Sequence, residues 1–269
     1  MPEPKVTKPT APLPAVAAIA GPKGRAGGPL DLRKQACEGG DGEVCHDLAA
    51  LYQEGDAGVG VSADTGEAAS YYTRSCDLGV GEGCIDGGML LEQTGSGAGA
   101  ATLYEKGCTL RKPQSCFNLA KLVDEGDGVD KDPGRAAMLF RQACEGGLGA
   151  GCTSLGLRYE NGEGVEKSPE RAIELYQKGC DRGSVNGCSN LGTMYQAGSG
   201  TPQDFAKAAQ YYERACQKGS GLGCFNQARL LEQGLGGAPD PAGAATLYEK
   251  ACAKGVGGAC EAKDRLRAQ

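Results

Sequence analysis

The sequence lacks tryptophan, and it has four phenylalanines and one histidine in 269 residues. Nucleophilic Ser/His and Cys/His relays need a histidine beside the nucleophile, so His46 alone leaves little room for such an active site. Zinc sites use Cys-x2–4-Cys or Cys/His clusters, and the sequence has no Cys-x-x-Cys motif. With 46 glycines and few aromatic residues, each part of the chain can bury little apolar surface. We therefore expect the fold to need another source of stability.

Long apolar runs are also missing. No stretch approaches the ~20 consecutive apolar residues that a membrane-spanning helix requires. The apolar segment 15–20 is short and flanked by prolines, so it does not form the core of a signal peptide. The sequence therefore predicts no membrane-spanning helix, and no export signal is recognised in it.

The charge is unevenly distributed along the chain. The net charge is -6, yet residues 1–35 carry six Lys or Arg against Glu3 and Asp31, and the rest of the chain is acidic. Nucleic-acid binding needs a basic surface, so nucleic acid is not an expected partner. The basic N-terminal segment could contact the acidic remainder or an anionic surface, but a solvated linker is the simpler interpretation.

What the sequence does have is a repeat built around cysteine pairs. All fourteen cysteines fall into pairs with seven residues between the two members, and the first members of successive pairs are 39, 32, 36, 36, 36 and 36 residues apart. A fixed period in this range is typical of a solenoid, in which each period forms one supersecondary unit. The pairs are Cys37 with Cys45, Cys76 with Cys84, Cys108 with Cys116, Cys144 with Cys152, Cys180 with Cys188, Cys216 with Cys224, and Cys252 with Cys260.

The residues before each first cysteine predict a helix. An Asp or Ser suited to capping the helix N-terminus stands twelve residues before that cysteine in six units, and an aromatic residue stands four residues before it. Apolar residues eight, five and four positions before the cysteine form one stripe at helical spacing. The capping residues are Asp64, Ser96, Asp132, Ser168, Asp204 and Asp240, and the aromatic residues are Tyr72, Tyr104, Phe140, Tyr176, Tyr212 and Tyr248.

A second helix is predicted to begin near each second cysteine. Four residues after that cysteine the side chain is small in the first six units: Ala49, Gly88, Ala120, Gly156, Gly192 and Ala228. Because a glycine within a helix costs about 1 kcal/mol relative to alanine, its recurrence at this position predicts a close crossing with a neighbouring helix.

The cysteine pairs are predicted to form structural disulfides. Cysteines with this spacing cannot meet across a continuous helix, but a glycine-rich turn between them brings the end of one helix next to the start of its antiparallel neighbour. Closing a loop of this length contributes about 2–3 kcal/mol in the chain-entropy model. All fourteen cysteines are therefore candidate structural residues. His46, one residue after Cys45, is expected at the surface of the first hairpin rather than as a ligand.

The predicted organisation is a disordered spacer followed by one repeat domain. Residues 1–29 are rich in Pro, Ala and Gly, which favours a disordered spacer. Residues 30–269 are predicted to form an all-α, α/α-hairpin solenoid, with capping half-units at 30–54 and 240–269.

The repeat resembles a known family. The matching residues are Leu155-Gly-x-x-Tyr159-x-x-Gly162-x-Gly-Val165, then Arg171-Ala-x-x-Leu-Tyr176-x-Lys-Gly, and their copies in the other units. This pattern is similar to the Sel1-like repeat family, whose α/α hairpins are related to tetratricopeptide repeats. The Cys-x7-Cys pairs resemble those of its cysteine-rich branch, which includes secreted Helicobacter proteins. The resemblance covers roughly residues 30–269 and implies a superhelix of about six to seven repeats that serves as a scaffold for a protein or peptide partner.

Two other functions are weighed against the scaffold. Some cysteine-rich relatives carry penicillin-binding or β-lactamase labels, but none of the eleven serines has a lysine three residues later, and Lys-Thr-Gly and Gly-x-Ser-x-Gly are missing. The second alternative is a thiol, metal or haem-binding assembly factor. A mitochondrial cytochrome oxidase assembly factor with Sel1-like repeats is a more distant relative. Such a role would require reduced cysteines. The acidic segment 124–132 lacks the ligand spacing of a calcium-binding loop.

We therefore expect a non-catalytic protein that binds a protein or peptide on the concave face of the solenoid. No catalytic residue, cofactor site or metal site is predicted, and a monomer is expected. Disulfides belong to oxidising compartments, so we expect an extracytoplasmic location, which is the periplasm, the outside of the cell or another oxidising compartment, although no export signal is visible.

Overall fold

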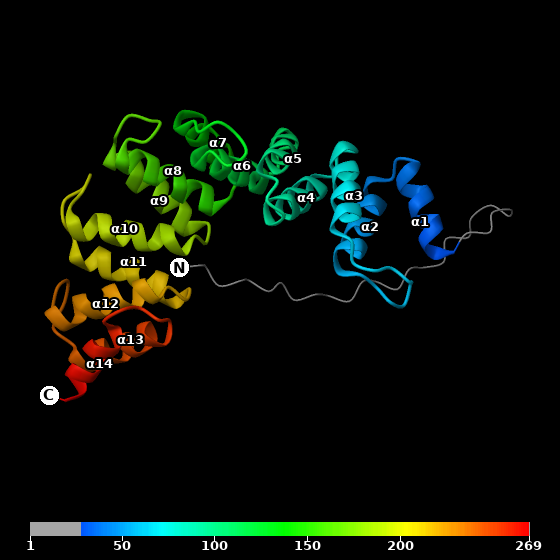
Figure 1. Ribbon diagram of the computed structural model, residues 1–269. Coiled ribbons are helices and arrows are strands. Elements are labelled where there is room, and N and C mark those ends of the chain that lie inside the picture. Colours follow the sequence, from blue (N-terminus) through cyan, green and yellow to red (C-terminus); the bar gives the residue numbers. More distant parts are fainter. Residues whose placement is uncertain (1–27, 269) are drawn as a thin grey trace.

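The computed structural model describes residues 28–268, which form fourteen α-helices and an isolated β-bridge between Asp56 and Val61. The helices follow one another in a curved row, from α1 through α6 and α7 to α14 (Figure 1). The odd-numbered helices are α1 (Pro29–Glu38), α3 (Thr65–Asp77), α5 (Gly97–Thr109), α7 (Pro133–Glu145), α9 (Pro169–Asp181), α11 (Phe205–Gln217) and α13 (Pro241–Ala253). The even-numbered helices are α2 (Gly42–Glu54), α4 (Gly81–Gln93), α6 (Pro113–Glu125), α8 (Gly149–Asn161), α10 (Val185–Ala197), α12 (Gly221–Gln233) and α14 (Ala259–Arg267).

Side-chain caps explain where most of the odd-numbered helices begin. In five of the six predicted positions the Asp or Ser side chain accepts a hydrogen bond from a backbone amide of the first turn; these are Asp64, Asp132, Ser168, Asp204 and Asp240. Ser96 makes no such bond, so this predicted cap is wrong. Only Thr94, Gly95 and Ser96 separate α4 from α5. This loop is shorter than its counterparts and leaves Ser96 with φ -99° and ψ 67° instead of an extended backbone.

The seven predicted disulfides are all present and confirm the hairpin architecture. Each bond joins the last turn of an odd-numbered helix to the first turn of the next even-numbered helix, with Cα atoms 4.4–4.9 Å apart. No cysteine is left free. Because the linked helices run antiparallel around a tight turn, each bond fixes one helical hairpin at its closed end. The bonds join Cys37 to Cys45, Cys76 to Cys84, Cys108 to Cys116, Cys144 to Cys152, Cys180 to Cys188, Cys216 to Cys224, and Cys252 to Cys260.

Small residues and buried tyrosines form the contacts between helices. Tyr176 of α9 is fully buried, and a Cβ atom added to Gly156 of α8 would lie 2.8 Å from its ring. The same contact joins Gly192 to Tyr212, where the distance would be 2.7 Å. A side chain at either glycine would displace the ring, so the predicted close crossing is confirmed.

A second recurring contact joins the long loops to the preceding hairpin. In the loop between α8 and α9, Gly164 has φ +70°, and an added Cβ atom would lie 2.1 Å from the carbonyl oxygen of Pro133, which begins α7. The loops after α6, α10 and α12 make the corresponding contact through Gly128, Gly200 and Gly236. Backbone therefore packs directly on backbone where one hairpin meets the next.

The even-numbered helices line the inner side of the curve along the middle of the row. Some helices contact the helix two places further along the chain. Three of these pairs are even-numbered, namely α4 with α6, α6 with α8 and α8 with α10, and one is odd-numbered, namely α3 with α5. Successive layers of a curved stack approach most closely on its inside. We infer that the even-numbered helices from α4 to α10 lie on the inside of the curved row of helices that Figure 1 shows.

Within residues 28–268, none of the helices combines the length and the apolar character that crossing a bilayer requires. The predicted spacer at 1–29 falls almost wholly outside the described residues. The predicted domain limits and the capping half-units at 30–54 and 240–269 stay predictions.

Candidate partner-binding face

The exposed side of the even-numbered helices carries a continuous row of side chains. Positions two and five residues after each second cysteine lie on one helix face, because residues three apart in a helix are neighbours. From α4 to α12 these positions are half-buried or exposed. We call this row the inner strip; it consists of Asp86, Met89, Asn118, Lys121, Ser154, Leu157, Asn190, Thr193, Asn226 and Arg229.

Buried tyrosines from the odd-numbered helices reach one edge of the inner strip. The hydroxyl of Tyr176 donates a hydrogen bond of 2.5 Å to Glu160 at the end of α8, and Tyr248 donates one of 2.7 Å to Glu232 at the end of α12. Tyr212 donates to Gln196 over 2.8 Å. Equivalent bonds join Tyr72 to Gln53 and Tyr104 to Glu92. The same polar contact therefore recurs at five of the junctions between successive hairpins.

The environment of these hydroxyls keeps them protonated. Burial raises the pKa of Tyr176 well above its usual value, and the hydrogen bond to the Glu160 carboxylate raises it further, while hydrogen bonding to Asn190 of the inner strip acts in the opposite direction. The pKa of Tyr104 is raised by the same causes, burial first, and Asn118 opposes the shift. Tyr104 and Tyr176 thus each place a fixed hydroxyl between a carboxylate of one even-numbered helix and an asparagine of the next.

The central hairpin replaces this contact with an ion pair. Phe140 stands where the other hairpins have tyrosine, and Asp124 of α6 instead accepts a 2.9 Å hydrogen bond from Arg158 of α8. The Arg158 guanidinium also pairs with Glu163 and lies 5.9 Å from the centre of the Phe140 ring. Its side chain is 13% exposed. Sequence reasoning missed this network, although the repeat alignment does place Arg158 where α10 has the buried Met194.

His46 links the first two even-numbered helices. Its Nε2 atom lies 2.9 Å from the Asp86 carboxylate of α4, and its ring packs against Tyr72. The side chain is 24% exposed, so His46 lies partly at the surface of the first hairpin and also contacts the neighbouring one. The hydrogen bond to Asp86 raises the pKa of His46 despite the opposing effect of burial.

The His46–Asp86 contact should make stability depend on pH. Because the folded-state pKa of His46 lies above its unfolded value of about 6.5, the stabilisation is complete below that value and is lost as the pH rises through the raised pKa. We expect His46→Gln to lower the urea unfolding midpoint at pH 5.5 and to have a smaller effect at pH 8.5. The difference should stay below about 1 kcal/mol, as for other partly exposed pairs. An equal effect at both pH values would contradict this assignment.

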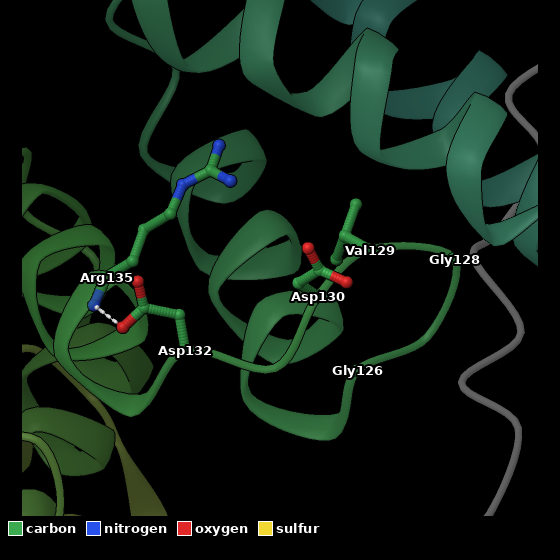
Figure 2. Close-up of a pocket in the computed structure, with 6 residues that line it drawn as sticks. All are labelled: Gly126, Gly128, Val129, Asp130, Asp132 and Arg135. Carbon is green, nitrogen blue, oxygen red and sulfur yellow. Dashed lines mark hydrogen bonds between the residues drawn. The ribbon is translucent and has the colours of Figure 1, made fainter.

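A separate surface hollow is lined by residues outside the inner strip. It occupies about 730 Å³ beside the loop between α6 and α7 and is lined by Gly126, Gly128, Val129, Asp130, Asp132 and Arg135. Asp132 caps α7 by accepting a hydrogen bond from the backbone amide of Arg135 (Figure 2). The Arg135 guanidinium is bound to Glu105 over 2.7 Å. These contacts serve the fold, so the hollow offers few uncommitted polar groups.

The acidic loop around this hollow does not gather its carboxylates. Asp124 is paired with Arg158, and Asp132 caps α7. No group of three or more His, Cys, Asp or Glu side chains within 28–268 is placed to hold a metal ion. Two of the carboxylates in this segment, Asp124 and Asp132, thus have structural partners. That the chain has no catalytic, cofactor or metal residue stays a prediction.

A smaller hollow lies at the C-terminal end of the inner strip. It occupies about 360 Å³ and is lined by residues of α12, α13 and α14, including Arg229 of the strip. It places two arginines, a glutamate and two aromatic rings around one space. No feature of the repeat alone predicts this hollow, because it depends on how the last helix packs.

Comparisons with known proteins identify the repeat. The family model described as the Sel1 repeat matches residues 42–80, 113–148, 149–184, 185–220 and 221–256, more than half of the chain. No curated protein sequence matches the chain. The predicted resemblance to Sel1-like proteins is confirmed.

Similar solved structures share the helical solenoid. A protective antigen present in uropathogenic Escherichia coli strains, displaying an SLR fold, is 28% identical with a TM-score of 0.77, covering 86% of this chain and 50% of the antigen. This chain therefore spans half the length of that protein. A Sel1 repeat protein from Oxalobacter formigenes is 24% identical with a TM-score of 0.67, covering 79% of this chain and 85% of its own. Helicobacter pylori cysteine rich protein B is 28% identical with a TM-score of 0.41, covering 48% of this chain and 96% of its own.

Proposed function

Because this chain belongs to the Sel1 repeat family, we propose that it is a non-catalytic scaffold that binds a protein or peptide partner along the inner strip. The supporting observation is the repetition of exposed polar side chains over successive even-numbered helices, each set beside a buried hydroxyl such as that of Tyr176. Side chains held in one conformation lose little entropy when a partner binds. A regular array of this kind suits an extended chain, whose own polar groups recur at short intervals.

The apolar members of the strip add contact area. Met89 is 44% exposed and Leu157 is 38% exposed, and they lie on α4 and α8 with Lys121 of α6 between them in the row. Exposed apolar side chains within a polar surface favour a protein or peptide partner over a small polar ligand.

Seven intramolecular disulfides suggest an oxidising, extracytoplasmic compartment. We propose more specifically that the protein works in the periplasm or outside the cell. The similar Escherichia coli protein is a protective antigen, and an exposed location of this chain would agree with that property.

Selection of peptides on the oxidised protein tests the proposal. We expect a displayed random-peptide library to yield binders, and Leu157→Glu to weaken their binding at least about tenfold because it removes an apolar contact and adds a charge. The matched control is Met138→Glu, which makes the same kind of change at an exposed residue of the odd-numbered helix α7. That variant should bind as the unmodified protein does. Failure to enrich any peptide, or equal losses in both variants, would refute the proposal.

A further inference from the structure

The hollow at the C-terminal end of the inner strip is built from three consecutive helices. Phe225, Arg229 and Glu232 come from α12, Tyr248 from α13 and Arg265 from α14. The Phe225 ring meets the Tyr248 ring edge-on, with centroids 5.4 Å apart. One wall of the hollow is therefore aromatic, and the remaining walls carry charge.

The charges in the hollow are unequally paired. Glu232 accepts a hydrogen bond from Tyr248 over 2.7 Å and one from Arg265 over 2.5 Å, so its carboxylate is already bound on the protein side. Arg229 is exposed and makes no ion pair within the part of the chain that the structure describes. Burial raises the pKa of Tyr248 and of Tyr212, and the positive charge of Arg229 lowers both pKa values by a smaller amount. The Arg229 guanidinium therefore lies near both tyrosine hydroxyls.

One uncompensated positive charge is left in the hollow. Arg229 and Arg265 together with Glu232 sum to +1. Arg265 is held by Glu232, whereas the guanidinium of Arg229 has donors left for a ligand. A guanidinium binds a carboxylate through two parallel hydrogen bonds. A singly charged anion matches this balance, while a dianionic phosphate would meet the Glu232 carboxylate with too little positive charge.

We propose that this hollow binds the C-terminal carboxylate of an extended peptide lying along the inner strip. The inference rests on the proposed function and specifies that the C-terminus of the bound peptide is recognised as a free carboxylate. Arg229 is itself a member of the strip, so a chain following Leu157, Thr193 and Arg229 arrives at the hollow. There Gly258, directly before α14, and Ala262 of α14 line the far side of the hollow. The terminal side chain of the peptide packs against Phe225, and its carboxylate binds Arg229.

A comparison of peptide acids and amides tests this assignment. Peptides selected from a library displayed with free C-termini are synthesised with either a carboxylate or an amide at the C-terminus, and their binding is measured by fluorescence anisotropy. We expect the amide to bind about 10- to 100-fold more weakly, as for loss of a hydrogen bond to a charged group. Arg229→Gln should weaken the acid by a similar factor and the amide much less, so that the ratio of acid to amide affinity falls toward one.

The matched control is Lys121→Gln, which removes a positive charge at the equivalent position of α6 and should leave the ratio of acid to amide affinity unchanged. Circular dichroism confirms that each variant is folded. Equal affinity of acid and amide, or dependence on an internal Asp or Glu instead of the C-terminus, would overturn the assignment. Stronger competition by inorganic phosphate than by acetate at equal ionic strength would overturn it as well. If Leu157→Glu abolishes binding while Arg229→Gln does not, the scaffold proposal stands and this inference fails.

Discussion

Reduction of all seven disulfides is expected to unfold the solenoid under conditions where the oxidised protein is fully helical. Each bond closes a loop with a sequence separation of 8, which contributes about 2–3 kcal/mol in the chain-entropy model. Seven such contributions, about 14–21 kcal/mol in total, are as large as or larger than the net stability of about 5–15 kcal/mol that is typical of folded proteins. The remaining core consists largely of alanine, leucine and single tyrosines. Circular dichroism at 222 nm, with and without a phosphine reductant, measures the loss of helix.

A variant that lacks one of the seven disulfides serves as the control for this experiment. Replacing both Cys180 and Cys188 with alanine removes one buried disulfide and should lower the free energy of unfolding by about 2–3 kcal/mol while the other hairpins stay closed. A reduced protein that melts cooperatively at the same temperature as the oxidised protein would contradict the stabilising role of the disulfides.

Gly164→Ala is expected to be a strongly destabilising change in a loop. At φ +70° a residue with a Cβ atom is strained, and the new atom would lie 2.1 Å from the carbonyl oxygen of Pro133. Because the clashing atoms belong to backbone, the loop must move away from α7. Strain and overpacking together should cost about 2–4 kcal/mol, measured by urea unfolding of the oxidised protein.

Gly183→Ala separates the cost of backbone strain from the cost of the steric clash. Gly183 also has a positive φ, +90°, but an added Cβ atom would meet nothing within 4 Å. This variant should lose only the conformational part, about 1–2 kcal/mol. If Gly164→Ala and Gly183→Ala lower the free energy of unfolding equally, the loop moves away from α7 without cost and its backbone contact does not stabilise the fold.

The repeat made most of this fold predictable from the sequence. The cysteine spacing placed the turns, Asp and Ser residues placed helix starts, and recurring small residues such as Gly156 marked the crossings. These features are local or recur with the period, so an alignment of the repeats shows them directly. Ser96 failed as a cap because its loop is shorter than the others, which changes the backbone that the cap requires.

The contacts that break the repeat were not predictable. Arg158 stands where a buried apolar residue is expected, and its partner Asp124 belongs to the preceding even-numbered helix. His46 and Asp86 are 40 residues apart and belong to different hairpins. The hollow around Arg229 exists because Arg265 of the last helix turns toward Glu232. Each of these depends on side-chain positions in three dimensions, for which the period carries no information.

The disulfides also cross the boundaries between family repeats. The family model places boundaries at 148/149 and 184/185, while Cys144–Cys152 and Cys180–Cys188 join residues on either side of them. Solenoid stability depends on the interfaces between neighbouring repeats. Here those interfaces are covalently linked, so a repeat cannot separate from its neighbour at this boundary.

The short separation of the paired cysteines has a consequence for oxidative folding. Fourteen thiols can pair in about 135,000 ways, and most of these arrangements would trap a wrong fold. Each native partner is 8 residues away, whereas the nearest cysteine of another pair is 24 to 31 residues away. Closing the shorter loop is favoured by about 1 kcal/mol of chain entropy, even before any helix forms. The native pairings are thus favoured in the unfolded chain, and each hairpin can oxidise correctly without waiting for the rest of the array.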